Sequence, residues 1–145
     1  MIDSTLPQQR LSSSPNAVLR WTTIVFTIAL AVHAADHLRR GMGILSPLVM
    51  TLGSIQQVLA IVTIVLVFTR HRWAPTAAIV VGFFSAGGFT VVHLLPDWFG
   101  PLSDSFIAAP ASARVTGFSW FAAIFEIVAD IAIAIAGLRA RNSWL

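Results

Sequence analysis

The sequence predicts an all-α integral membrane protein, a polytopic bundle of four helices. Hydrophobic residues make up 57% of its 145 residues and charged residues only 10%, whereas about a quarter of the residues of a soluble domain are charged. Mean hydropathy is +0.82, and four apolar segments each approach the length of about 20 residues that spans a bilayer. These features exclude a soluble globular domain, a disordered chain and a coiled coil. The absence of cysteine excludes disulfides, thiolate metal sites and cysteine nucleophiles.

The first element is a polar stretch, residues 1–16, with two prolines and three successive serines. We expect a flexible cytoplasmic tail there, followed by a single four-helix transmembrane domain over residues 17–141. The first helix is predicted over 17–38 and is closed by two arginines and a glycine. A cleaved signal peptide is the alternative, because residues 21–32 have the length of a signal core and the Ala-Leu-Ala triplet at 29–31 resembles a cleavage site. The long polar stretch ahead of it favours a retained helix.

The second and third helices are delimited by proline and by charged turns. The second is predicted over 47–69, because Ser46 can cap a helix and Pro47 is favoured in a first turn. The third is predicted over 74–95 and ends at Pro96, which cannot continue a helix.

The longest connection, residues 96–115, is predicted to be an extracytoplasmic loop. It contains three prolines and two acidic residues. Its aromatic side chains, Trp98, Phe99 and Phe106, are expected to cover the end of the bundle as a lid. The fourth helix is predicted over 116–138 and is followed by two further arginines.

Arginines set the predicted orientation. All nine basic residues are arginines, which together with abundant alanine and valine indicates a high-GC bacterial source. Cytoplasmic loops carry the excess of positive charge, and six arginines against three favour a cell (inner or plasma) membrane protein with both termini in the cytoplasm. The inside set is Arg10, Arg20, Arg70, Arg72, Arg139 and Arg141, and the outside set is Arg39, Arg40 and Arg114. Because the arginines lie at helix ends and not on one face, no nucleic-acid partner is predicted.

The first helix carries four polar residues on one face. His33, Asp36, His37 and Arg40 are spaced i, i+3, i+4 and i+7. Two imidazoles one turn apart are placed as two ligands of one metal ion are, and imidazole suits zinc, copper, iron and nickel. The alternative is structural: Asp36 pairs with Arg40 one turn on, and the histidines lie in the headgroup layer.

Two carboxyl groups on the fourth helix are the strongest functional signal in the sequence. Glu126 and Asp130 lie one turn apart in an otherwise apolar segment, and Glu126 lies about 15 Å from the start of the helix, near the bilayer midplane. Two carboxylates at this depth require a cation or a shared proton. The alternative is that both are neutral and join helices by hydrogen bonds.

The other two helices add polar groups of their own. The third helix contributes His93, preceded on roughly the same face by the small residues Ala78, Gly82 and Ala86, which allow close helix contact. On the second helix, Gln57 rather than Gln56 is expected to face inward. The combined depths of these residues predict one polar His/Asp/Glu site, formed by all four helices and opening outward.

This site is compatible with a bound metal or cofactor. A divalent transition metal is predicted to take His33, His37, His93 and Glu126 as ligands. A haem is the other cofactor that the residues allow, with one histidine of the first helix, such as His33, and His93 as axial ligands, and with Arg39, Arg40 or Arg114 near its propionates.

Two further hypotheses do not need a metal. One is acid–base catalysis on a hydrophobic or lipid-like substrate, for which Glu126, Asp130 and Asp36 are the predicted catalytic residues. The other is a proton relay or a non-catalytic subunit of a larger membrane complex. The sequence leaves open whether the protein is an enzyme. The partners it predicts are membrane lipids, a lipid-like substrate, and a second copy of the chain or a larger complex.

Overall fold

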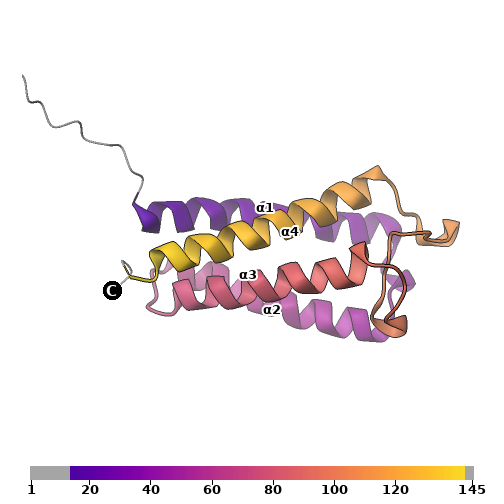
Figure 1. The fold of residues 1–145 in the computed structure, drawn as a ribbon, viewed down its shortest axis with the longest axis horizontal. Coiled ribbons are helices and arrows are strands. Elements are labelled where there is room, and N and C mark those ends of the chain that lie inside the picture. Colours follow the sequence, from indigo (N-terminus) through magenta and orange to yellow (C-terminus); the bar gives the residue numbers. More distant parts are fainter. Residues whose placement is uncertain (1–13, 143–145) are drawn as a thin grey trace, which may run out of the picture.

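The computed structural model describes residues 14–142 and shows the predicted four-helix bundle (Figure 1). Its helices are α1 (Pro15–Arg40), α2 (Pro47–Phe68), α3 (Ala74–Phe89) and α4 (Gly117–Ala140). The third helix continues as a π-helical turn, Thr90–Leu94, and the described residues contain no strand. All four helices, with the third counted over Ala74–Leu94, are long and apolar enough to cross a membrane. These features are those of a multi-pass membrane protein.

Local sequence determines where the helices begin. α1 begins at Pro15, earlier than the predicted residue 17, because the Ser14 hydroxyl accepts a hydrogen bond from the Ala17 N–H at 3.3 Å and proline needs no donor in the first turn. α2 begins as predicted, with the Ser46 hydroxyl accepting a backbone N–H of the first turn at 3.1 Å. Residues 1–13 of the expected tail lie outside the described part of the chain.

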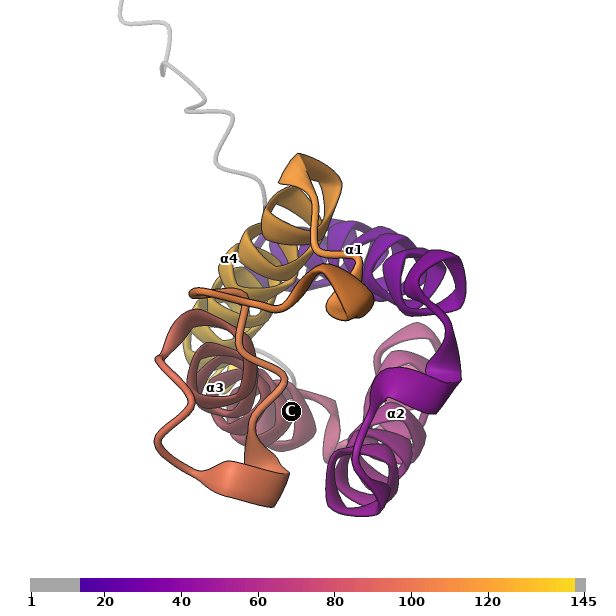
Figure 2. The same ribbon diagram turned by 90° about the vertical axis from the view of Figure 1, so that its right-hand side faces the viewer.

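The helices run alternately up and down, so the start of α1 and the end of α4 lie together (Figure 1). We call that end the terminal end, and we call the opposite end, which carries residues 96–115, the loop end. Viewed from the loop end, α4 lies between α1 and α3, and α2 packs chiefly against α3 (Figure 2). α4 is therefore the most buried helix and α2 the least.

Small residues bring the backbones of α3 and α4 into contact. A Cβ atom added to Gly82 would lie 2.5 Å from the Asp130 carbonyl oxygen, and one added to Gly137 would lie 2.8 Å from the Pro75 carbonyl oxygen. Real Cβ atoms do not approach so closely, so both positions require glycine. The predicted small-residue face, which includes the buried Ala78, is the surface on which α4 packs.

The prediction that Gln57 faces inward is wrong. Gln57 is exposed, whereas Gln56 donates a hydrogen bond from its amide to the hydroxyl of Ser85 on α3 at 3.2 Å. The reason is the helical period: the buried Ala60 and Thr63 follow Gln56 at i+4 and i+7, so all three share the stripe that packs against the bundle.

Candidate metal centre

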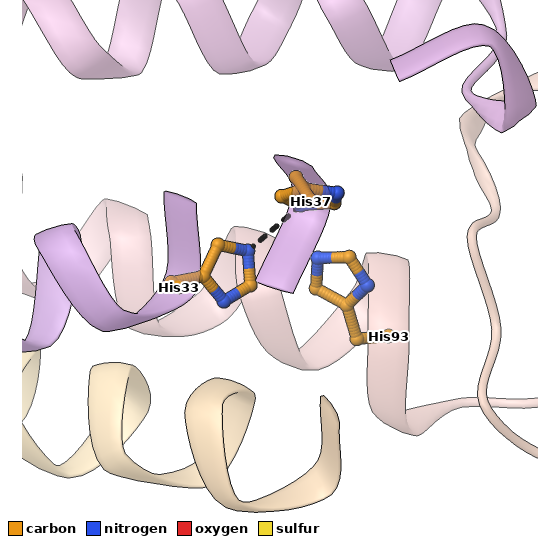
Figure 3. Close-up of side chains that lie close together, drawn as sticks. All are labelled: His33, His37 and His93. Atoms are coloured by element: carbon orange, nitrogen blue, oxygen red, sulfur yellow. Dashed lines mark hydrogen bonds between the residues drawn. The ribbon is translucent and has the colours of Figure 1, made fainter. Parts of the chain in front are cut away.

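Three histidines converge at the loop end of the bundle (Figure 3). His33 and His37 come from α1, one turn apart, and His93 comes from the π-helical turn after α3. One ring nitrogen from each lies within 4.8 Å of the others, and the Nε2 atoms of His33 and His37 are 3.0 Å apart. His33 and His93 are buried and His37 is half-buried. The structure thus joins the helix-one pair to a histidine sixty residues away in the sequence.

The π-helical turn aims His93 at the other two histidines. Its wider turn changes the direction in which side chains leave the helix axis, and such turns are frequent at functional sites. The ring centroid of His93 lies 5.0 Å from that of His33 and 5.6 Å from that of His37. Sequence periodicity assumes a regular helix, so it did not reveal this turn.

Asp104, in the loop, orients His93. The Nδ1 atom of His93 lies 3.2 Å from the Asp104 carbonyl oxygen and 3.4 Å from its carboxylate. The other ring nitrogen, Nε2, therefore points toward His33 and His37 (Figure 3). A carboxylate or carbonyl on the far nitrogen is the usual partner of a metal-ligating histidine. Sequence reasoning did not assign this role to Asp104, because no local spacing links a loop residue to a helix residue.

Arg40 holds Asp104 in place. Its guanidinium donates two hydrogen bonds to the Asp104 carboxylate, at 2.7 and 2.6 Å, and a third to the Ala113 carbonyl at 2.9 Å. Burial raises the pKa of Asp104, but hydrogen bonds with His93 and Arg40 outweigh this effect and lower the pKa to about 2. Asp104 is therefore ionised at neutral pH and forms a buried ion pair.

The expected pairing of Asp36 with Arg40 is wrong. Asp36 pairs instead with Arg39, at 2.8 Å, and accepts a hydrogen bond from the Ser119 hydroxyl of α4 at 3.1 Å. The physical reason is that the loop folds over the end of α1 and offers Arg40 a bidentate carboxylate, Asp104. Asp36, which is 2% exposed, consequently joins α1 to α4.

Of the three aromatic residues expected in the lid, only Phe106 covers the histidines. Its ring centroid lies 4.8 Å from that of His93, and the Arg40 guanidinium lies 5.1 Å from the same ring. Trp98 and Phe99 are exposed, at 70% and 46%. Phe89 packs against His33 from the α3 side, with centroids 4.7 Å apart.

Glu126 and Asp130 lie deeper in the bundle and do not belong to the group of three histidines. Both are fully buried, and none of their carboxyl oxygens has a hydrogen-bond partner among the described residues. The contact between Asp36 and Ser119 aligns α1 with α4. From that contact, Glu126 lies seven residues toward the terminal end along α4, and His33 lies three residues toward it along α1. At a rise of 1.5 Å per residue, Glu126 is therefore about 6 Å deeper along the bundle axis than His33.

The arrangement of the histidines accommodates an ion better than a haem. A haem between His33 and His93 has to insert its flat ring between side chains whose centroids are 5.0 Å apart. Phe89 and Phe106 already pack against these two rings. Arg40, expected near the propionates, is fully engaged by Asp104 and Ala113. A single ion needs only the three convergent ring nitrogens.

Comparisons of the chain with protein-family models, with curated proteins and with solved structures find no match.

Proposed function

We propose that the protein is a membrane metalloenzyme whose centre binds one divalent transition-metal ion through His33, His37 and His93. The observation that carries this proposal is the approach of three ring nitrogens to within 4.8 Å of one another. Nitrogen ligands of one zinc ion, each at about 2.0–2.1 Å, lie about 3.3 Å apart in a tetrahedral site. The Nε2 atoms of His33 and His37, at 3.0 Å, are already close to this spacing.

The ligand set favours zinc or copper over magnesium or calcium. Imidazole nitrogen suits zinc, copper, iron and nickel, whereas hard cations prefer several oxygen ligands. No carboxylate belongs to the group of three. Three histidines with one open position are also the pattern of catalytic zinc sites, in which the fourth ligand is water or substrate.

The surrounding residues each have a role in this proposal. Asp104 fixes the orientation of His93, and Arg40 fixes Asp104. Phe89 and Phe106 exclude bulk water from two sides. The half-buried His37 marks the side from which a ligand can approach the ion. A bound ion there supplies Lewis acidity and a water ligand that ionises near neutral pH.

The substrate class that fits this site is a hydrophobic or lipid-like molecule. The centre lies inside a bundle whose outer surface is apolar along all four helices, so a substrate dissolved in the bilayer reaches it without crossing a polar surface. Asp36 is engaged by Arg39 and Ser119, and in this proposal it positions helices instead of acting on substrate.

Charge supports the predicted orientation, with the loop end outside the cell. The terminal end carries Arg20, Arg70, Arg72, Arg139 and Arg141 among the described residues. At the loop end, Arg39 and Arg40 are each paired with an aspartate, and Arg114 is the one further arginine among the described residues there. The excess of unneutralised arginine therefore lies at the terminal end, as the positive-inside rule requires of a cytoplasmic face.

Metal analysis of the full chain in detergent tests the proposal. After loading with Zn²⁺ or Cu²⁺ and removal of free ion, we expect one ion for each chain. His33→Ala and His93→Ala should abolish this binding. His71→Ala is the matched control, because His71 is exposed in the turn between α2 and α3, at the other end of the bundle from the centre, and its loss should leave the metal content unchanged. Unchanged metal content in both centre variants refutes the proposal, and a Soret band in the absorption spectrum shows that the centre holds haem.

A further inference from the structure

The carboxyl groups of Glu126 and Asp130 are not used by the proposed metal centre. They lie on one face of α4, one turn apart, and both side chains are 0% exposed. None of their four oxygens has a hydrogen-bond partner among the described residues. Buried polar groups without partners destabilise a fold, so such groups call for a functional explanation.

Among the described residues, no buried cation accompanies these two carboxyls. α2 (Pro47–Phe68) and α3 (Ala74–Phe89) contain no ionisable residue. On α4, Arg139 follows Asp130 by nine residues, about 13 Å along the axis. On α1, Arg20 lies about 7.5 Å nearer the terminal end than Asp130 by helix rise, but its side chain is exposed on the outside of the bundle, and the next ionisable residue is His33. Without a bound ion, an ionised carboxylate at this depth has no partner, so the neutral acid is the stable form.

A divalent ion in the histidine centre changes this balance. Three neutral imidazoles leave its double positive charge uncompensated. The two aspartates nearest the centre are already neutralised, Asp36 by Arg39 and Asp104 by Arg40. Of the other described acids, Asp97 is exposed in the loop, which leaves the two buried carboxyls of Glu126 and Asp130; Glu126 lies about 6 Å below His33 along the bundle axis by helix rise. This offset runs along the axis only and the full separation is larger, but in surroundings of low dielectric constant the attraction between a carboxylate and a divalent ion extends over such distances.

We propose that Glu126 and Asp130 form a proton-binding site that releases one proton when a divalent ion occupies the three-histidine centre. One carboxyl O–H bond breaks, its electron pair stays on the oxygen, and the proton leaves for bulk water. The resulting carboxylate offsets part of the charge of the ion, and the proton returns when the ion leaves. No electron is transferred. The assignment rests on the proposed metal centre.

Ser85 and Gln56 mark a polar layer near the depth of Glu126. Gly82 lies against the Asp130 carbonyl oxygen, and Ser85 lies three residues nearer the loop end, about 4.5 Å along the axis. Glu126 lies one turn nearer the loop end than Asp130. The hydrogen-bonded amide and hydroxyl of Gln56 and Ser85 therefore border the same level. These protic groups lie at the level of the carboxyl pair without a hydrogen bond to it.

Infrared difference spectroscopy of the full chain in detergent, without and with Zn²⁺, tests this proposal. We expect Zn²⁺ to remove the C=O stretching band of a protonated carboxyl group and to release about one proton into a weakly buffered solution. The Glu126→Gln/Asp130→Asn double variant should lack both responses and bind Zn²⁺ about tenfold more weakly. Asp97→Asn is the matched control, because Asp97 is an exposed loop acid whose loss should leave both responses intact.

The outcomes separate this proposal from the metal centre on which it rests. If the wild-type protein binds Zn²⁺ with no change in its carboxyl band, the proton site is refuted and the metal centre stands. If a band change persists in the double variant, another acid is responsible and the proposal is wrong. If the wild-type protein binds no Zn²⁺, both proposals are wrong. An unchanged carboxyl band in the wild type refutes the proposal without any variant, and if the double variant does not fold, the single variants Glu126→Gln and Asp130→Asn show whether the band belongs to these two residues.

Discussion

Replacing Arg40 with methionine should detach the loop from α1 and loosen His93. Methionine reproduces the apolar stem of the side chain without the guanidinium, so both hydrogen bonds to the Asp104 carboxylate and the third to Ala113 are lost. The ion pair is buried, at 0% and 10% side-chain exposure, and breaking such a pair from one side costs about 3–5 kcal/mol. Because Asp104 orients His93, Zn²⁺ affinity should also fall by about 10–100-fold.

Equilibrium unfolding in detergent, followed by tryptophan fluorescence, measures the loss of stability. Trp120, one of five tryptophans, lies beside the loop, with its ring centroid 5.6 Å from that of Phe106. A double-mutant cycle with Asp104→Asn should give a coupling energy of at least about 2 kcal/mol. Arg139→Met, at an exposed position at the terminal end, serves as the control. A stability of Arg40→Met within about 0.5 kcal/mol of the wild type, as for an ordinary surface substitution, refutes the assigned role of the ion pair.

Two further predictions concern packing and access. Gly82→Ala places a Cβ 2.5 Å from the Asp130 carbonyl oxygen and should destabilise the bundle by about 1–3 kcal/mol. The control is Gly87→Ala, where nothing lies within 4 Å of the added Cβ, and it should be neutral or stabilising. Equal effects of the two substitutions in the same unfolding assay contradict the close α3–α4 contact. Phe106→Ala removes the ring that covers His93 and should speed the removal of Zn²⁺ by a water-soluble chelator, whereas an unchanged rate means that the loop does not limit access.

Expectations based on local spacing agree with the structure most closely. The start of α2 at Ser46 and Pro47 follows from the preference of serine and proline for a helix start, and the structure shows that capping bond. The common face of His33 and His37 follows from the helical period and needs no knowledge of the rest of the fold. The prediction for Gln57 failed because the helical period alone does not show which face of the second helix is buried. The buried stripe that contains Gln56 is recognisable only once α3 is in place.

The sequence by itself determined the four membrane-spanning helices, the pair of imidazoles on α1 and the pair of carboxyls on α4, because each depends on composition or on a spacing within one helix. Only the tertiary structure decided which of these residues meet. It placed His93 against α1 through a π-helical turn, brought Asp104 to Arg40 across sixty-four residues, and left Glu126 and Asp130 at a deeper level without partners. The physical reason is that helical geometry fixes neighbours one turn apart, whereas contacts between helices depend on the path of the loop and on the small residues that set how closely α3 and α4 approach.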